Sequence, residues 1–252
     1  MLTSQEVTNY DFLREEYTDE QRQAWTLLNQ KQRIMIQEQA SASYLECYDA
    51  LQLDSEEIIL VENLNERLRA HTDWQTVKVP GLVPTPEFFQ LLSQKKYPIT
   101  VAVRGIHEIE YSELPDKFHD IHGHVPMLIR QDFGDFVEQF SQLGLQYLDN
   151  PEALMGLERF YWYTFEMGLI KEQNDLRCYG GALITSKQEM ENAREEQVQK
   201  FPFSVDKMVN TDRVIDHLQE HYFVTDSLAE LFDCLPRLES SLNRFTFAAP
   251  LQ

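Results

Sequence analysis

Three of the seven histidines of this chain and two aspartates fall within twelve residues, PDKFHDIHGHVP at positions 115–126. A further carboxylate follows at Glu166, inside the aromatic run FYWYTFE at positions 160–166. Two imidazoles and one carboxylate on one face of a metal, with the other positions open, are the ligand set of non-haem Fe(II) oxygenases. The need to bring these two distant segments together around one ion is the strongest constraint that the sequence places on the fold.

The spacing of the histidines leaves two ligand pairs open. His119 and His124 are five residues apart, so at ~100° per residue their side chains would point about 140° apart on an undisturbed helix. A helix-ending Gly123 with positive φ would let His124 swing back toward the turn that carries His119. His119 and His122 share a face without any break in the helix. Spacing alone does not choose between the two pairs.

Glu166 is the sharper indication of a metal, because its segment is apolar on nearly every side. A buried carboxylate costs several kcal/mol unless it is paired or bound to a metal. A buried arginine such as Arg104 or Arg177 could pair with Glu166 instead, which would make it a structural residue. A His/His/Glu set also does not by itself separate iron from zinc.

Charge and composition exclude several other classes of protein. The formal net charge of −20 argues against nucleic-acid or anionic membrane partners, because both reward clusters of Lys and Arg. Cys47, Cys178 and Cys234 are far apart and form no CxxC pair, so we expect no disulfide framework and a reducing compartment. The sequence shows no signal peptide and no apolar run of the ~18 residues that a membrane span needs. We therefore expect a cytoplasmic protein.

The hydrophobic patterns predict a mainly α-helical protein with small β hairpins, an α+β fold. Because neither a repeat nor a low-complexity linker divides the chain, we expect one domain over residues 1–252. Periodicity and start signals predict helices over 19–39, 43–51, 54–68, 85–92, 132–148, 151–170 and 227–238. A further helix should begin at a capping box formed by Ser186 and Glu189. We expect an ordered loop at 77–86, a hairpin over 97–103 and 107–111, and strands at 176–179 and 222–224.

Three motifs carry a resemblance to a known family. Residues 115–126 match the family pattern PDxxHExxxHVP at Pro115-Asp116, His119, His124 and Val125-Pro126. The run YWYTFEMGL at 161–169 is similar to YWFTVEFGL, and YGGALITS at 179–186 is similar to YGAGLLSS. The motifs stand in the family's order, and the likeness covers roughly residues 20–235. The chain thus resembles the aromatic amino acid hydroxylases, which contain iron and depend on a tetrahydropterin.

The resemblance implies a role for individual residues. It selects His119 and His124, rather than His122, as ligands of Fe(II), and adds Glu166 as the third ligand. The other roles that it implies are substrate binding by Arg104, Ser112, Trp162 and Thr185, pterin binding by Gly81, Leu82, Phe88 and Asp120, and a catalytic place near the iron for Tyr161 and Asp120.

The chain departs from the family pattern mainly around the pterin and the substrate. Asp120 replaces a glutamate, Pro98 a histidine and Met167 a phenylalanine, while Ala182 stands at a glycine position and His122 at an apolar one. These changes leave the implied iron ligands intact. The family's regulatory domain and tetramerisation helix have no room here, so we expect the short bacterial type, a monomer.

The resemblance implies that Fe(II), O2 and a tetrahydropterin hydroxylate the ring of an aromatic L-amino acid. Phenylalanine, giving tyrosine, is the leading substrate, with tryptophan or an atypical aromatic as alternatives. Two other classes make different predictions. A zinc hydrolase would use Asp120 or Glu108 as its general base and would need no O2. A non-enzymatic acidic helical protein would bind metal adventitiously and form no product.

Overall fold

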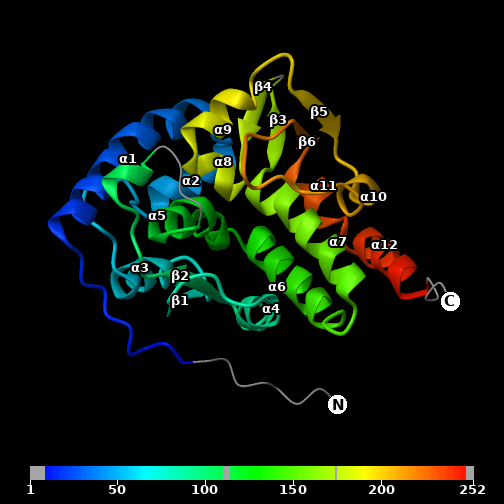
Figure 1. Ribbon diagram of the computed structural model, residues 1–252, viewed down its shortest axis with the longest axis horizontal. Helices are drawn as coiled ribbons and strands as arrows, with labels where there is room; N and C mark the ends of the chain where they lie inside the picture. Colours follow the sequence, from blue (N-terminus) through cyan, green and yellow to red (C-terminus); the bar gives the residue numbers. More distant parts are fainter. Residues whose placement is uncertain (1–8, 110–113, 174, 248–252) are drawn as a thin grey trace.

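Helices make up most of the computed structural model, which describes residues 9–109, 114–173 and 175–247 (Figure 1). The α-helices are α1 (Asp19–Gln39), α2 (Ala42–Ala50), α3 (Val61–Leu68), α4 (Thr85–Leu92), α5 (Lys117–His119), α6 (Gln131–Leu145), α7 (Pro151–Tyr161), α8 (Gly181–Thr185), α9 (Lys187–Asn192), α10 (Val205–Met208), α11 (Leu228–Phe232) and α12 (Leu235–Phe247). The strands are β1 (Gln75–Val79), β2 (Lys96–Thr100), β3 (Leu169–Glu172), β4 (Asp175–Cys178), β5 (Gln199–Pro202) and β6 (His221–Thr225). The predicted fold class is confirmed.

The strands form two small sheets on different sides of the helices (Figure 1). One sheet has the order β4-β3-β6-β5, in which β3 and β4 form an antiparallel hairpin and the other pairs are parallel. In the other sheet β1 pairs with β2 in parallel, with Gln75 opposite Lys96. Helix α4 lies between β1 and β2 in the chain, so this sheet is a β–α–β unit.

The hairpin predicted over 97–103 and 107–111 is therefore wrong. Its first half does contain a strand, β2, but the partner of β2 is β1, part of which was predicted as loop. Residues Ile106–Glu108 form a 3₁₀ turn instead of a return strand, and residues 110 and 111 lie outside the described part of the chain. Strands that pair across about twenty residues, as β1 and β2 do, leave no local sign of that pairing in the sequence. The alternating pattern that suggested a hairpin covers only a few residues.

Three predicted helices have different limits. Helix α3 begins at Val61 rather than near Asp54, and its first N–H group donates to the carboxylate of Glu15, at 3.1 Å from Oε1. The residues before it are held in irregular structure because the carbonyls of Ser55 and Glu56 accept hydrogen bonds from side chains of α1. The helix predicted to continue to residue 170 ends in a π-helical turn, Trp162–Glu166, before β3. The last predicted helix is divided into α11 and α12.

Aromatic side chains fill the core between α6 and α7, which run beside each other across the middle of the molecule (Figure 1). Phe140 of α6 packs against Phe160 of α7 and against Phe165, with ring centroids 5.8 and 5.1 Å apart. Phe136 stacks on Phe165 from the same side. This packing fixes the π-helical turn after α7, and with it the position of Glu166. Within the described ranges, no helix has both the length and the apolar character that crossing a membrane requires.

Candidate metal centre

A π-helical turn places the first two candidate ligands. Asp116 caps α5 by accepting a hydrogen bond from the backbone N–H of His119, and the chain then widens into a π-helical turn at Asp120–His124. Because a π-helix bonds residue i to i+5, His124 falls beside His119. The positive φ considered as one possibility for Gly123 is not present, since no glycine in the described residues has one. Gly123 is needed for space, because a Cβ there would lie 2.9 Å from the backbone of Gly181.

Glu166 completes a compact triangle of ligand atoms. The Nε2 atoms of His119 and His124 are 3.1 Å apart, and Glu166 lies 3.3 Å from His124 and 3.6 Å from His119. Ligands bound at ~2.1 Å and right angles to one ion would be about 3.0 Å apart, so the three side chains fit three adjacent positions around a metal. Among the His, Cys, Asp and Glu residues that the structure describes, these three have ligand atoms within 4.8 Å of one another, close enough to hold one metal ion.

The electrostatics of the triangle also suit a cation. Burial alone would raise the pKa of Glu166, but His124 and His119 outweigh it and lower that pKa to about 2. Burial lowers the pKa of His119 to about 4, so its ring is neutral at pH 7. Oε2 of Glu166 is buried and has no hydrogen-bond partner. An anionic oxygen without a partner and a neutral imidazole are the donors that a divalent metal requires.

Neither of the arginines considered for Glu166 pairs with it. Arg104 makes a buried fork with Asp116, with Nε and Nη2 at 2.9 and 2.8 Å from the carboxylate oxygens. Arg177 lies 3.3 Å from Asp175. The pairing of Glu166 with either of these two arginines is therefore wrong.

Thr185 fixes the orientation of the His119 ring. Its hydroxyl donates to the carbonyl of Gly181 at 2.8 Å, so its oxygen accepts the Nδ1–H of His119 at 2.9 Å. Nδ1 then carries the proton, and the lone pair of Nε2 faces His124 and Glu166. The resemblance implied a substrate contact for Thr185, and the sequence gave no sign of its bond to His119.

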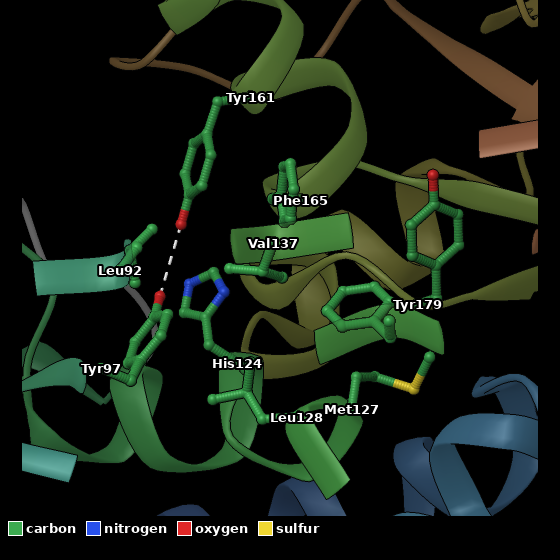
Figure 2. Close-up of a pocket in the computed structure, with 11 residues that line it drawn as sticks. Leu92, Tyr97, His124, Met127, Leu128, Val137, Tyr161, Phe165 and Tyr179 are labelled. Atoms are coloured by element: carbon green, nitrogen blue, oxygen red, sulfur yellow. Dashed lines mark hydrogen bonds between the residues drawn. The ribbon is translucent and has the colours of Figure 1, made fainter. Parts of the chain in front are cut away.

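His122 is separate from the triangle. Its ring is buried and stacks on Phe118, with centroids 4.2 Å apart, and Nδ1 lies 3.1 Å from the carbonyl oxygen of Phe118. The alternative ligand pair of His119 and His122 is thereby excluded. His124 is held differently: its ring stacks on Tyr97, whose hydroxyl lies 3.3 Å from that of Tyr161 (Figure 2). The void behind His124 is only ≈ 10 Å³, which is too small for an organic ligand.

A much larger cavity of ≈ 860 Å³ lies against the triangle. This is within the size range of small-molecule sites. All three candidate ligands line it, together with most of the residues that the resemblance implied: Gly81, Leu82, Phe88, Arg104, Asp120, Tyr161, Trp162 and Thr185. Ser112 lies outside the described residues. Glu108 is not among the lining residues, so it cannot serve as a general base here.

Asp120 differs from the other carboxylates of the site. It is buried, and its Oδ2 accepts a hydrogen bond from the backbone N–H of Thr100 at 2.7 Å. Burial raises the pKa of Asp120 to about 7, although the Thr100 bond and His124 oppose the shift. Asp120, which lines the cavity, is therefore partly protonated near neutral pH.

Sequence reasoning missed one wall of the cavity. Seven consecutive residues, Arg213–Gln219, line it, together with Gln188 and Glu189 at the start of α9. No motif marks this loop. The only sign in the sequence is that apolar Val214, Ile215 and Leu218 interrupt a polar segment.

Comparison with known proteins decides the family. A model of the biopterin-dependent aromatic amino acid hydroxylases matches residues 8–248. The chain belongs to this family. It is 36% identical to the phenylalanine-4-hydroxylase of Chromobacterium violaceum over 221 residues, which cover 86% of this chain and 73% of that protein. It is 33% identical to the phenylalanine-4-hydroxylase of Pseudomonas aeruginosa, over 86% of this chain and 82% of the other.

Solved structures of the family have the same fold. The Chromobacterium violaceum phenylalanine hydroxylase with bound iron(III) and oxidised cofactor 7,8-dihydrobiopterin superposes with a TM-score of 0.85, at 35% identity over 91% of this chain and 84% of that one. The iron- and phenylalanine-bound form of that enzyme gives a TM-score of 0.84, at 35% identity over 93% and 85% of the two chains. Family membership removes the zinc hydrolase and the non-enzymatic protein as explanations of the site.

Proposed function

We propose that this protein is an iron- and tetrahydropterin-dependent monooxygenase that converts phenylalanine to tyrosine. The observation that carries the proposal is the triangle of His119, His124 and Glu166 at the wall of a cavity large enough for an amino acid and a pterin. Relatives at 31–37% identity that cover most of this chain are named phenylalanine-4-hydroxylases, which supports phenylalanine over tryptophan or an atypical aromatic.

The three triangle residues would hold Fe(II). Two imidazole nitrogens and one carboxylate would occupy one face of the ion and leave the cavity side open. The chemistry that iron and pterin supply together is the activation of O2 for attack on an aromatic ring. The protein's own part is to fix the ring and the cofactor against the metal and to keep bulk water out. Tyr161, whose hydroxyl is held by Tyr97, would form part of the wall beside the metal.

The cavity offers separate places for the two organic ligands. Arg104 would bind the carboxylate of the amino acid, because Asp116 accepts bonds from only two of its five side-chain N–H groups, Nε–H and one on Nη2. Trp162 would contact the substrate ring. Phe88, the Gly81-Leu82 loop and Asp120 would border the pterin. Pro98, which replaces a histidine of the family, also lines the cavity. Ser112 remains a further candidate for substrate binding.

We further propose that residues 1–252 act as one catalytic domain, as a monomer in the cytoplasm, without nucleic-acid or membrane partners. The net charge of −20 supports the last point, since it repels polyanions. Sedimentation or size-exclusion measurements with and without phenylalanine test the monomer.

One assay tests the activity. The protein is loaded with Fe(II) without oxygen and then mixed with O2, tetrahydropterin and phenylalanine, tyrosine or tryptophan, and the products are identified by mass. We expect tyrosine from phenylalanine, at a rate higher than the rate of product formation from the other two amino acids. A hydroxylated product from tryptophan alone would correct the substrate, and product formation after zinc replaces iron would overturn the proposal.

Variants of the ligands separate metal binding from substrate binding. Glu166→Ala should lose iron, whereas Arg104→Ala should keep iron and raise the KM for phenylalanine. His122→Ala is the control, because this histidine does not belong to the triangle: it should retain iron stoichiometrically, even if the protein is less stable. Stoichiometric iron after the replacement of both His119 and His124 would contradict the ligand assignment.

A further inference from the structure

The loop between α10 and β6 has no role in the function proposed so far. Its residues Arg213–Gln219 nevertheless form one wall of the cavity. Two apolar side chains of this wall, Ile215 and Leu218, are 62% and 43% exposed, whereas Gln219 is only 3% exposed. The loop is held to the protein at Gln219 and, at its other end, by the hydrogen bond from Arg213 to Glu158 at 3.2 Å, while Ile215 and Leu218 contribute little burial.

Every polar group of Gln219 is hydrogen-bonded. Its backbone N–H donates to Glu189 Oε1 at 3.2 Å, and its backbone carbonyl accepts from Asn192 at 2.8 Å. In the side chain, Nε2 donates to the carbonyl of Val214 at 2.8 Å, and Oε1 accepts from Nε1–H of Trp162 at 3.1 Å. The side-chain amide therefore joins the loop to the indole of Trp162, which is 57 residues earlier in the sequence.

The groups that hold Gln219 are themselves fixed. Glu189 is buried, and besides the Gln219 N–H it accepts a hydrogen bond from the hydroxyl of Tyr222. Asn192 donates to the same hydroxyl at 2.9 Å. A hydrogen-bonded network of this kind, in which Gln219, Glu189 and Tyr222 are buried, holds its members in one arrangement. The backbone of Gln219 is thus held in place, and its side-chain amide has a fixed position at the cavity wall.

Trp162 connects this network to the segment that carries Glu166. It lies four residues before Glu166, and its side chain lines the same cavity as the three candidate ligands. An indole without an acceptor for its N–H would turn that group toward water or another acceptor and change the face that it presents. The bond to Gln219 selects one orientation of the flat ring.

We propose that Gln219 is a positioning residue, whose amide holds the Trp162 indole as a wall against the aromatic ring of the substrate. The inference rests on the proposed function, because it assumes an aromatic amino acid in the cavity. It assigns part of the affinity for the substrate ring to a loop residue that does not itself contact the metal.

The variant Gln219→Met tests this role, because methionine keeps the length of the side chain and removes both amide hydrogen bonds. We expect the KM for phenylalanine to rise about fivefold, while kcat and the KM for tetrahydropterin stay within about twofold. In a Trp162→Phe background the same substitution should have no effect on KM, because the donor is already absent. An equal rise of KM in both backgrounds would overturn the proposal.

A matched control removes a partly buried amide elsewhere. Asn65 exchanges side-chain hydrogen bonds with the backbone of Thr76, at 2.7 and 2.8 Å, and is not among the cavity-lining residues. Asn65→Leu should lower the thermal midpoint but leave the KM for phenylalanine unchanged. A KM that rises in this variant as much as in Gln219→Met would mean that general loss of stability explains the effect.

A second readout does not depend on catalysis. The chain has three tryptophans, so ¹⁵N-labelled protein should give three indole N–H signals by NMR, and Trp162→Phe assigns one of them. We expect the Trp162 signal to exchange slowly with solvent in the wild type and quickly in Gln219→Met. Fast exchange in the wild type would overturn the proposal, even if Gln219→Met does not fold. Slow exchange in a protein that hydroxylates no amino acid would leave the hydrogen bond intact and refute only the proposed function.

Discussion

The hydroxyl oxygen of Thr185 lies 2.9 Å from Nδ1 of His119, and the hydroxyl donates its hydrogen bond to the carbonyl of Gly181. This relationship determines which nitrogen of the histidine faces the candidate metal position. It also ties the first ligand to α8, the helix whose residue Gly181 packs against Gly123. The site is therefore organised by contacts between two segments that are distant in the sequence.

Replacement of the hydroxyl should weaken metal binding. Thr185→Val keeps the shape of the side chain but leaves His119 Nδ1 without an acceptor, so the ring is free to adopt the other tautomer. We expect the affinity for Fe(II) to fall roughly 10- to 100-fold, as is usual when such a partner of a ligand is lost. Competition with a chromophoric chelator measures it. Thr185→Ser, which retains the oxygen, should bind iron nearly as the wild type does; equal affinities for all three proteins would contradict the assigned hydrogen bond.

A side chain at Gly181 should displace a ligand directly. A Cβ at this position would lie 2.5–2.9 Å from ring atoms of His124, closer than real contacts allow. We expect Gly181→Ala to lower the free energy of unfolding by about 1–3 kcal/mol and to prevent stoichiometric metal binding. Gly81 is the control for stability, because a Cβ there meets nothing within 4 Å. The two variants should differ in thermal midpoint, and indistinguishable midpoints would show that α8 can move away from His124.

The three cysteines should be unreactive in the folded protein. Burial raises the pKa of the Cys47 thiol to about 11, and those of Cys178 and Cys234 to about 12. Since only the thiolate reacts, and its population falls as the pKa rises, modification by a disulfide reagent at pH 8 should be very slow. We expect three thiols to react after denaturation and the native rate to increase as the pH approaches 11. A native thiol that reacts at pH 8 as fast as in the denatured chain would contradict this burial.

Local sequence signals predicted much of the fold and the ligand set. The Thr18 cap and amphipathic pattern of α1 lie within one segment, and the helix has the predicted limits. At Ser186 the predicted capping box is only half formed: Ser186 accepts from the N–H of Glu189, but the Glu189 carboxylate bonds to Gln219 and Tyr222 instead. The local signal was correct, and a tertiary contact replaced its second half.

The parts that could not be predicted depend on contacts between distant segments. The cap of α3 is supplied by Glu15, 46 residues earlier, and the partner of β2 is β1. Both π-helical turns lack a propensity signal, since an inserted residue is stabilised by packing rather than by its own side chain. That is why spacing on a regular helix left His119 and His124 about 140° apart, although the structure brings them together.

The buried ion pair of Arg104 and Asp116 should be the most sensitive electrostatic contact near the site. The two side chains are only 8% and 6% exposed, and the carboxylate also accepts from the backbone N–H groups of Arg104 and His119. Asp116→Ala would leave a buried guanidinium without a partner and remove the cap of α5. We expect the free energy of unfolding, measured in urea, to fall by about 3–5 kcal/mol.

An exposed pair of the same residue types provides the comparison. Nη1 of Arg33 lies 3.0 Å from both carboxylate oxygens of Asp54, and both side chains are 53% exposed. Water screens this pair, so Asp54→Ala should cost less than about 1 kcal/mol, and added salt should reduce the cost further. A loss at Asp116 as small as the loss at Asp54 would mean that water reaches Arg104 when its partner is removed.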